Sequence, residues 1–140
     1  MTTSTAPVPI KTQRVGSALL IIDGDKILLG KRAKNPGFGN WVLPGGKVEW
    51  GETHIQAAIR GGREELGLDV EPIRLAGKGV YYMTNGDVQR VIVYNIARAV
   101  GGTLTPSSDI SEARYFIREE LKNLGVGGSS AEVLKDEGWL

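Results

Sequence analysis

One helical pattern, residues 53–67, most constrains the fold, because strand-like runs both precede and follow it. Thr53 and Gln56 match the capping box, in which each side chain satisfies a free amide at the start of a helix. Gly67 is the residue type that commonly ends a helix. Apolar or small residues recur at a spacing that places them on one helix face, namely Ile55, Ile59, Gly62 and Leu66. The pattern predicts a helix that packs this face against a sheet.

Strands are predicted on the N-terminal side of this helix. Residues 14–22 and 26–32 are mostly apolar, and Asp23-Gly24 between them is a strong hairpin signal. A glycine-rich stretch then leads to a short apolar run at residues 41–43. We therefore expect a hairpin and one short strand before the helix.

Two long strand-like runs follow the helix, at residues 68–82 and 88–100, with the hairpin signal Thr84-Asn85-Gly86-Asp87 between them. The remaining elements are predicted to be a short strand at 111–116, a helix at 118–123, a flexible break at 125–130 and a terminal helix at 131–137. Strands interspersed with helices indicate an α/β domain with a mixed sheet. The pattern does not give the order of the strands.

Length and composition fit one domain. The chain has 140 residues, of which 41% are hydrophobic and 24% charged, so it is long enough to bury a core of its own. Residues 1–10 are rich in Thr, Ser and Pro, and we assign them to a flexible leader. Residues 11–140 are then a single domain.

Charge and residue usage exclude several classes of function. A formal charge of +1 argues against a broad surface for nucleic-acid duplexes, and the absence of cysteine excludes disulfides and thiolate metal sites. No run approaches the roughly 18 apolar residues of a membrane span. The first residues lack the charged and apolar regions of a secretory signal. We therefore expect a cytoplasmic protein with no membrane or duplex partner.

Two adjacent carboxylates on the helix, Glu64 and Glu65, are candidate metal ligands. At about 100° per residue, Glu64 lies opposite the apolar stripe together with Arg60 and Gly61, and Glu65 lies on their flank. Both carboxylates can then point outward. Hard oxygen ligands of this kind suit Mg²⁺ or Mn²⁺. Paired glutamates on a helix are more often a solvated face, so their spacing to other residues decides between the two interpretations.

The segments before the helix supply candidate substrate contacts. Gly45 and Gly46 lack a Cβ atom, so the backbone there can turn sharply and approach a phosphate closely. Arg32, at the end of a predicted strand, is a candidate phosphate contact because a guanidinium forks onto oxygen atoms. A solvated strand end is an equally good interpretation of Arg32.

Seven residues of this region stand at fixed spacing: Gly46, Glu52, Arg60, Glu64, Glu65, Gly67 and Leu68. Their spacing resembles the Nudix box, the signature of the Nudix hydrolase superfamily. The flanking sequences WVLPGG and LDV are also similar to the family, and the wider resemblance covers residues 14 to 122. It implies an α/β/α sandwich with a mixed central sheet.

The resemblance also implies an activity. Nudix enzymes use Mg²⁺ or Mn²⁺ to hydrolyse a nucleoside diphosphate linked to another moiety, by attack of water at phosphorus. Glu64 and Glu65 match the metal-binding pair of the family, and Gly45 matches a glycine whose carbonyl often joins them. Glu52 and Arg60 match a structural pair that orients the loop on the helix. Family members are often homodimers, so a homodimer is also expected.

The sequence departs from the family pattern at Gly61 and Gly62. Gly61 replaces a glutamate that binds metal or acts as general base in many members, and glycine can do neither. Another carboxylate must then act as the base, and the candidates are Glu49, Asp109 and Glu112. We take Glu112 as the catalytic candidate together with Glu64 and Glu65.

Two alternatives remain open. A GDP-mannose mannosyl hydrolase also lacks the glutamate at the position of Gly61, but it relies on a downstream histidine, and the only histidine here is His54 at the helix start. The other alternative is a binding module that keeps the nucleotide pocket and has lost turnover. The sequence does not identify the substrate among nucleoside triphosphates, ADP-ribose, dinucleoside polyphosphates and sugar nucleotides.

Overall fold

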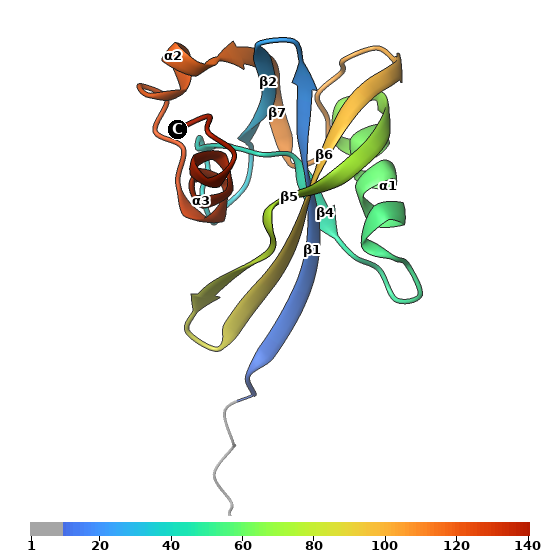
Figure 1. Ribbon diagram of the computed structural model, residues 1–140. Coiled ribbons are helices and arrows are strands. Elements are labelled where there is room, and N and C mark those ends of the chain that lie inside the picture. Colours follow the sequence, from blue (N-terminus) through green and yellow to red (C-terminus); the bar gives the residue numbers. More distant parts are fainter. Residues whose placement is uncertain (1–9) are drawn as a thin grey trace, which may run out of the picture.

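The computed structural model describes residues 10–140, so the predicted leader lies almost wholly outside the described residues. Figure 1 shows the arrangement of the elements. The strands are β1 (Thr12–Asp23), β2 (Lys26–Arg32), β3 (Trp41–Val42), β4 (Gly45–Lys47), β5 (Leu68–Asn85), β6 (Val88–Gly102) and β7 (Ile110–Ile117). The helices are α1 (His54–Leu66), α2 (Arg118–Leu121) and α3 (Gly128–Asp136).

The seven strands form one mixed sheet with β1 near its centre. The main order is β3-β2-β1-β6-β5, with β7 paired to β2. On one edge, β1 runs parallel to β6 over ten residue pairs, from Thr12↔Val88 to Ile21↔Ala97. On the other edge β1 pairs first with β4, at residues 16–18, and then with β2, at residues 22–23. This second side of β1 is therefore shared by two strands, and β4 and β2 diverge from each other between the two paired segments.

Locally encoded elements match their predictions. Both predicted hairpins are present, and their glycines, Gly24 and Gly86, have φ values of 62° and 60°. The strand β4 was predicted as a loop, because a three-residue strand that begins with two glycines carries no alternating pattern. The terminal helix begins at Gly128, three residues before the predicted start, so it includes part of the predicted flexible break.

Helices cover both faces of the sheet, which confirms the α/β/α sandwich (Figure 1). On the α1 face, Ala58 and Leu66 are buried against residues of β1, β2 and β5. On the opposite face, α3 and the C-terminal residues bury Val133, Leu134 and Trp139 in the larger cluster. Polar contacts complete the docking of α3: Arg74 of β5 donates to Glu137 at 2.8 and 3.0 Å, and the Tyr81 hydroxyl donates to Asp136 at 2.5 Å.

The ends of α1 agree with the predicted caps, but its buried face differs from the prediction. Thr53 and Gln56 form the capping box, and Gly67 ends the helix with φ 70°. Ile55, expected in the core, is 43% exposed. Gly61 and Glu65, expected on the outward side, are both buried. The physical reason is β4, which covers a second side of the helix and was not foreseen as a strand.

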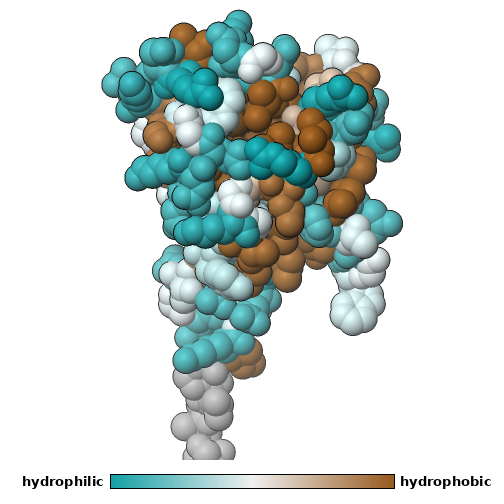
Figure 2. All heavy atoms as spheres, viewed as in Figure 1, coloured by the Kyte–Doolittle hydropathy of each residue, from teal (hydrophilic) through white to brown (hydrophobic). Residues whose placement is uncertain are grey.

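Some apolar side chains are exposed on β5, the strand at one edge of the sheet. Figure 2 shows hydrophobic residues gathered across the middle of the view of Figure 1. The end strand β5 contributes Ile73, Leu75 and Tyr82, each at least half exposed. Among residues 10–140, no helix has both the length and the apolar character needed to cross a membrane.

Candidate active site

The strand β4, which carries Gly45 and Gly46, packs closely against β1 and forms one wall of the candidate site. Gly45 stands opposite Ala18, and a Cβ atom at Gly45 would lie 2.5 Å from the Ser17 carbonyl oxygen and 2.7 Å from Ala18 Cα. Only glycine fits there. The neighbouring Gly46 faces α1, where a Cβ would lie 3.5 Å from Glu65 Oε1. The glycine pair therefore brings backbone directly against a carboxylate of the helix.

The Glu52–Arg60 pair fastens the following loop to the helix. Arg60 Nε donates to Glu52 Oε2 at 2.8 Å, and Arg60 Nη2 donates both to Glu52 Oε1 at 2.9 Å and to the Lys47 carbonyl at 2.7 Å. The backbone amide of Glu49 donates to Glu52 Oε1 at 2.8 Å. The hydrogen bond from Arg60, helped by that amide, lowers the pKa of Glu52 to about 2, and the same pairing raises the pKa of Arg60. The structure thus joins the two residues as the predicted structural pair requires.

Glu64 lies at the exposed end of this network. Its side chain is 59% exposed, and it accepts a hydrogen bond from Arg60 Nη1 at 3.0 Å. The segment before β7 is hydrogen-bonded to the last turn of α1. Ser107 donates through its hydroxyl to the Glu64 carbonyl and through its amide to the Glu65 carbonyl, the latter at 2.9 Å. This contact brings Asp109, two residues further along the chain, toward the helix.

Glu65 is the buried carboxylate of the site, with 8% of its surface exposed. Burial, together with the negative charges of Asp109 and Glu64, raises the pKa of Glu65 to about 8 against the opposing effect of Arg32 and Arg60. Within residues 10–140, none of the ion pairs includes Glu65. A buried carboxylate that lacks a cationic partner is typical of a functional group.

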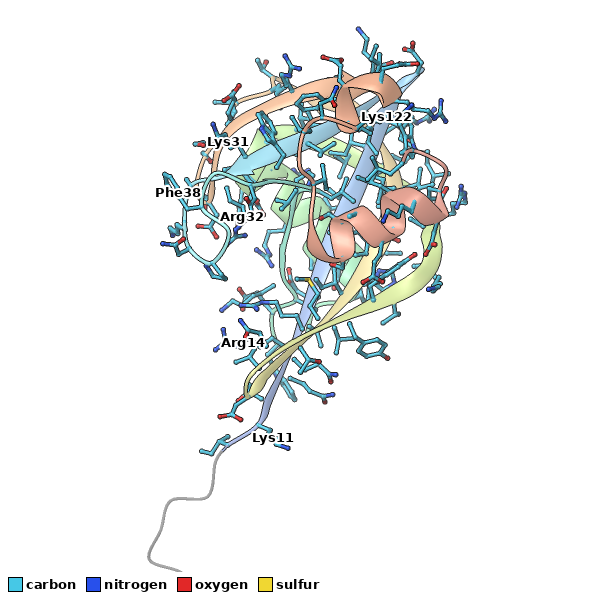
Figure 3. All side chains as sticks on the ribbon, turned by 90° about the vertical axis from the view of Figure 1, so that its left-hand side faces the viewer. Lys11, Arg14, Lys31, Arg32, Phe38 and Lys122 are labelled. Carbon is cyan, nitrogen blue, oxygen red and sulfur yellow. The ribbon has the colours of Figure 1, made fainter. Side chains whose placement is uncertain are left out.

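Arg32 and Asp109 come from the part of the sheet formed by β2 and β7. Arg32 is the last residue of β2, and Asp109 comes just before β7. The pairing of β2 with β7 shifts register between Lys31 and Arg32. Arg32 Nε then donates to the Pro36 carbonyl at 2.8 Å, and Figure 3 shows Arg32 beside the loop that follows it. The Ala33 amide donates to the Asp109 carbonyl at 2.8 Å. Both side chains are near enough to Glu65 to shift its pKa.

Glu112 and Glu49 lie elsewhere. Glu112 stands opposite Lys31 on β7 and is exposed. It shares a strand face with Phe116, which belongs to the core cluster on the α3 side, whereas Glu65 comes from α1 on the other side. Glu49 is exposed in the loop before α1. Of the three candidate bases, Asp109 is therefore the one whose charge acts on Glu65. Alternation along residues 111–116 could have indicated that Glu112 lies on the other face of the sheet.

Gly61 points into the same site. It is buried, and a Cβ atom there would lie 4.0 Å both from Glu65 Oε1 and from the Gly46 nitrogen. These are ordinary contact distances, so a side chain at this position fits and would be directed at Glu65. Gly62 differs, because its Cβ would lie 3.3 Å from the Leu68 carbonyl oxygen and from Val70 Cγ2. The absence of a side chain at Gly62 thus permits close packing on β5.

The donor set suits a magnesium-like cation that shares its ligands with a substrate. Within the described residues, no three carboxylate or histidine side chains come together as a complete metal site. Mg²⁺ usually binds through one or two carboxylates and completes its shell with waters and substrate phosphates. Glu65 and Glu64 are two such carboxylates, and Glu65 is buried and lacks the cationic partner that a bound metal would supply.

Comparison with known proteins identifies the class. The family description "NUDIX domain" matches residues 12–136. The chain is 37% identical over 119 residues to an ADP-ribose pyrophosphatase of Methanocaldococcus jannaschii, covering 83% of this chain and 68% of that protein. It is also 37% identical over 123 residues to an 8-oxo-dGDP phosphatase of Homo sapiens, covering 82% of this chain and only 36% of that protein.

A solved structure agrees. The crystal structure of a MutT NUDIX hydrolase from Burkholderia pseudomallei superimposes with a TM-score of 0.81 at 28% identity, covering 89% of this chain and 98% of the other. The fold, with helices on both faces of a mixed sheet, is thus shared with a solved Nudix hydrolase. The chain belongs to the Nudix hydrolase family.

Proposed function

We propose that the protein hydrolyses a nucleoside diphosphate linked to another moiety, with Mg²⁺ or Mn²⁺ as cofactor. The observation that carries the proposal is Glu65, a buried carboxylate outside any ion pair of the described residues, placed against the glycine backbone of β4. Such a group is costly to bury unless a cation compensates it. A metal held between Glu65 and a substrate diphosphate supplies that compensation.

Each residue of the site has a role in this proposal. Glu64, Glu65 and the Gly45 carbonyl hold the metal, which supplies polarisation of the phosphoryl oxygens and a lowered pKa of water when bound. Arg32 binds a phosphate oxygen, and the absence of side chains at Gly45 and Gly46 lets the diphosphate approach the backbone.

The general base is Asp109 in this proposal. Water attacks one phosphorus atom, the bridging P–O bond breaks, and the proton of the water passes to a carboxylate. Asp109 faces Glu65 closely enough to raise its pKa, and its own charge is balanced by Lys34 at 2.8 Å. The role predicted for Glu112 would instead require the reacting phosphate itself to lie on the α3 side of the sheet, away from Glu65.

The relatives suggest the first substrates to assay. ADP-ribose and 8-oxo-dGDP are the compounds in the names of the two relatives described above. Both contain a nucleoside diphosphate, and in ADP-ribose it is linked to another moiety, as the proposal requires. A homodimer and a cytoplasmic location stay predictions.

His54 does not favour the mannosyl hydrolase alternative. Its Nδ1 atom is hydrogen-bonded to Asn95 Nδ2 at 3.1 Å, and its carbonyl accepts from Ser17. It also lies eleven residues before Glu65 on α1, about 16 Å along the helix axis. A base at that distance does not reach a substrate held by Glu65.

The test is a product assay with ADP-ribose, 8-oxo-dGDP, nucleoside triphosphates and GDP-mannose, each with Mg²⁺, Mn²⁺ or EDTA. We expect metal-dependent release of a nucleoside monophosphate, and a loss of about 100-fold or more in kcat for Glu65→Gln. Glu119→Gln, which alters an exposed carboxylate of α2, is the matched control and should keep full activity. Free mannose with GDP would support the mannosyl hydrolase instead. Binding of nucleotides without turnover of any of them would leave a binding module.

A further inference from the structure

Three cations gather on the α3 side of the sheet, outside the site described above. Residues of β1 that are two positions apart share a face, and Ala18 and Leu20 pack in the cluster that includes α3. Arg14 therefore points to that side as well. Arg90 stands directly beside Arg14 on β6, and Lys47 of β4 stands opposite Gly16, the next residue of this face. Figure 3 looks at this side and shows Arg14 below the loop that contains Phe38.

The charge of this cationic cluster is uncompensated. In the part of the chain that the structure describes, no carboxylate lies within ion-pair distance of Arg14, Arg90 or Lys47. The other paired positions of this face on β1, β6 and β5 are uncharged, namely Thr12, Gly16, Val88, Ile92, Met83 and Tyr81. Glu49, two residues after Lys47, makes no ion pair with any of the three cations. Like charges on adjacent strand positions repel, so two neighbouring arginines are unfavourable without an anion. The arrangement provides fork-shaped donors for such an anion.

The surroundings of the cluster are also suited to an anion. Gly16 leaves the strand surface between Lys47 and Arg14 free of a side chain. On the far side, Met83 stands beside Arg90 and accepts a hydrogen bond at its sulfur from Ser129, in the first turn of α3. The positive end of that helix dipole therefore adds to the field of the arginines.

The cluster lies one nucleotide away from the diphosphate site. Gly45 pairs with Ala18, and Lys47 is two residues further along β4, about 7 Å away. Arg14 is four residues from Ala18 along β1, about 13 Å. A diphosphate at Gly45 and an anion at Arg14 therefore fit the two ends of a single nucleotide that carries a second phosphate on its sugar.

We propose that Arg14, Arg90 and Lys47 form a subsite for a sugar phosphate of the substrate, remote from the bond that is cleaved. The inference rests on the proposed function, because it takes the diphosphate to lie at Gly45. It narrows the substrate class to nucleoside diphosphate derivatives with a phosphate on the 2′ or 3′ oxygen of the ribose. The cluster selects this group by charge and does not take part in the cleavage.

A binding measurement in the absence of metal, and so of turnover, tests the subsite separately from the proposed function. The full chain is titrated by calorimetry, in EDTA, with adenosine 5′-monophosphate and with adenosine 2′,5′- and 3′,5′-bisphosphate, and the guanosine set is measured alongside. We expect one bisphosphate to bind at least about tenfold more tightly than its monophosphate. Arg14→Gln combined with Arg90→Gln should abolish that preference. Lys122→Gln, which removes an exposed cation far from the cluster, should retain it (Figure 3).

Equal affinity of the wild-type chain for each pair of ligands would overturn the proposal, and so would a preference that survives in the double variant. Absence of binding by every ligand would overturn it as well. A kinetic comparison follows if the protein turns over substrates. The double variant should then raise KM for coenzyme A more than for dephospho-coenzyme A, with kcat for coenzyme A retained. A preference in binding together with an absence of turnover would refute the proposed function and keep the subsite.

Discussion

Asp109 and Glu65 are two carboxylates from distant segments, and the negative charge of Asp109 contributes to the raised pKa of Glu65. In the proposed mechanism, Asp109, which is more exposed than Glu65, would accept the proton of the attacking water. Lys34 holds Asp109 in place from the outside through an ion pair of 2.8 Å. With Asp109 as the base, the proposed mechanism does not require a glutamate at position 61.

Substitution of the two candidate bases separates their roles. We expect Asp109→Asn to lower kcat by about 10²–10⁴, as removal of a general base does, and Glu112→Gln to cost clearly less. The measurement is kcat and its pH profile at saturating metal, with the unfolding temperature of each variant as a check on folding. The opposite order of effects would assign the base to Glu112.

The Glu52–Arg60 pair makes stability depend on pH in the acid range. The pKa of Glu52 is lowered in the folded protein to about 2 from an ordinary 4.5, chiefly by the hydrogen bond from Arg60. A carboxyl with a lowered folded pKa stabilises fully above its unfolded pKa, and that contribution is lost as the pH falls from 4.5 toward 2. Thermal unfolding of the wild type should therefore weaken more steeply over this range than that of Glu52→Gln. Parallel curves for the two proteins would contradict the assignment, and Glu119→Gln should follow the wild type.

At the scale of the helix, the two glycines of α1 behave differently under substitution. Gly61→Ala should stabilise the protein by up to about 1 kcal/mol, because a Cβ there meets no atom closer than 4.0 Å and alanine favours the helix. Gly62→Ala should destabilise, because its Cβ would lie 3.3 Å from the Leu68 carbonyl oxygen on β5. Urea denaturation of both variants measures the difference, and equal shifts in the same direction would refute this account of the packing.

Elements with local signals could be predicted from the sequence, and elements that depend on distant partners could not. The hairpin glycines and the caps at Thr53 and Gly67 are local, and both turned out as expected. The parallel pairing of β1 with β6 has no local signature. Spacing alone indicated Glu64 and Glu65, but the burial of Glu65 follows from β4, a strand of glycines with no side-chain pattern. The choice between Asp109 and Glu112 depended on the register of β7, which spacing does not provide.

At the scale of the whole molecule, α3 closes the second core. Leu134 is fully buried in the cluster on that face. Leu134→Ala should therefore cost about 2–5 kcal/mol of unfolding free energy. Val100→Ala, at a position that is 57% exposed, is the control and should change stability by no more than about 0.5 kcal/mol. Chemical denaturation measures both, and a small effect at Leu134 would show that α3 contributes little to the fold.

The place of β1 between β6 and the β4–β2 edge has a consequence for synthesis of the chain. Gln13 and Gln89, neighbours across the parallel pair, are 76 residues apart in sequence. A nascent chain emerging from the ribosome can therefore form the first hairpin early, but one side of its central strand stays open until β6 is made. Long-range pairing of this kind slows folding, because the loop must close before any contact rewards it. The core thus assembles late, and chains that terminate before residue 88 would present a bare strand edge to chaperones and to one another.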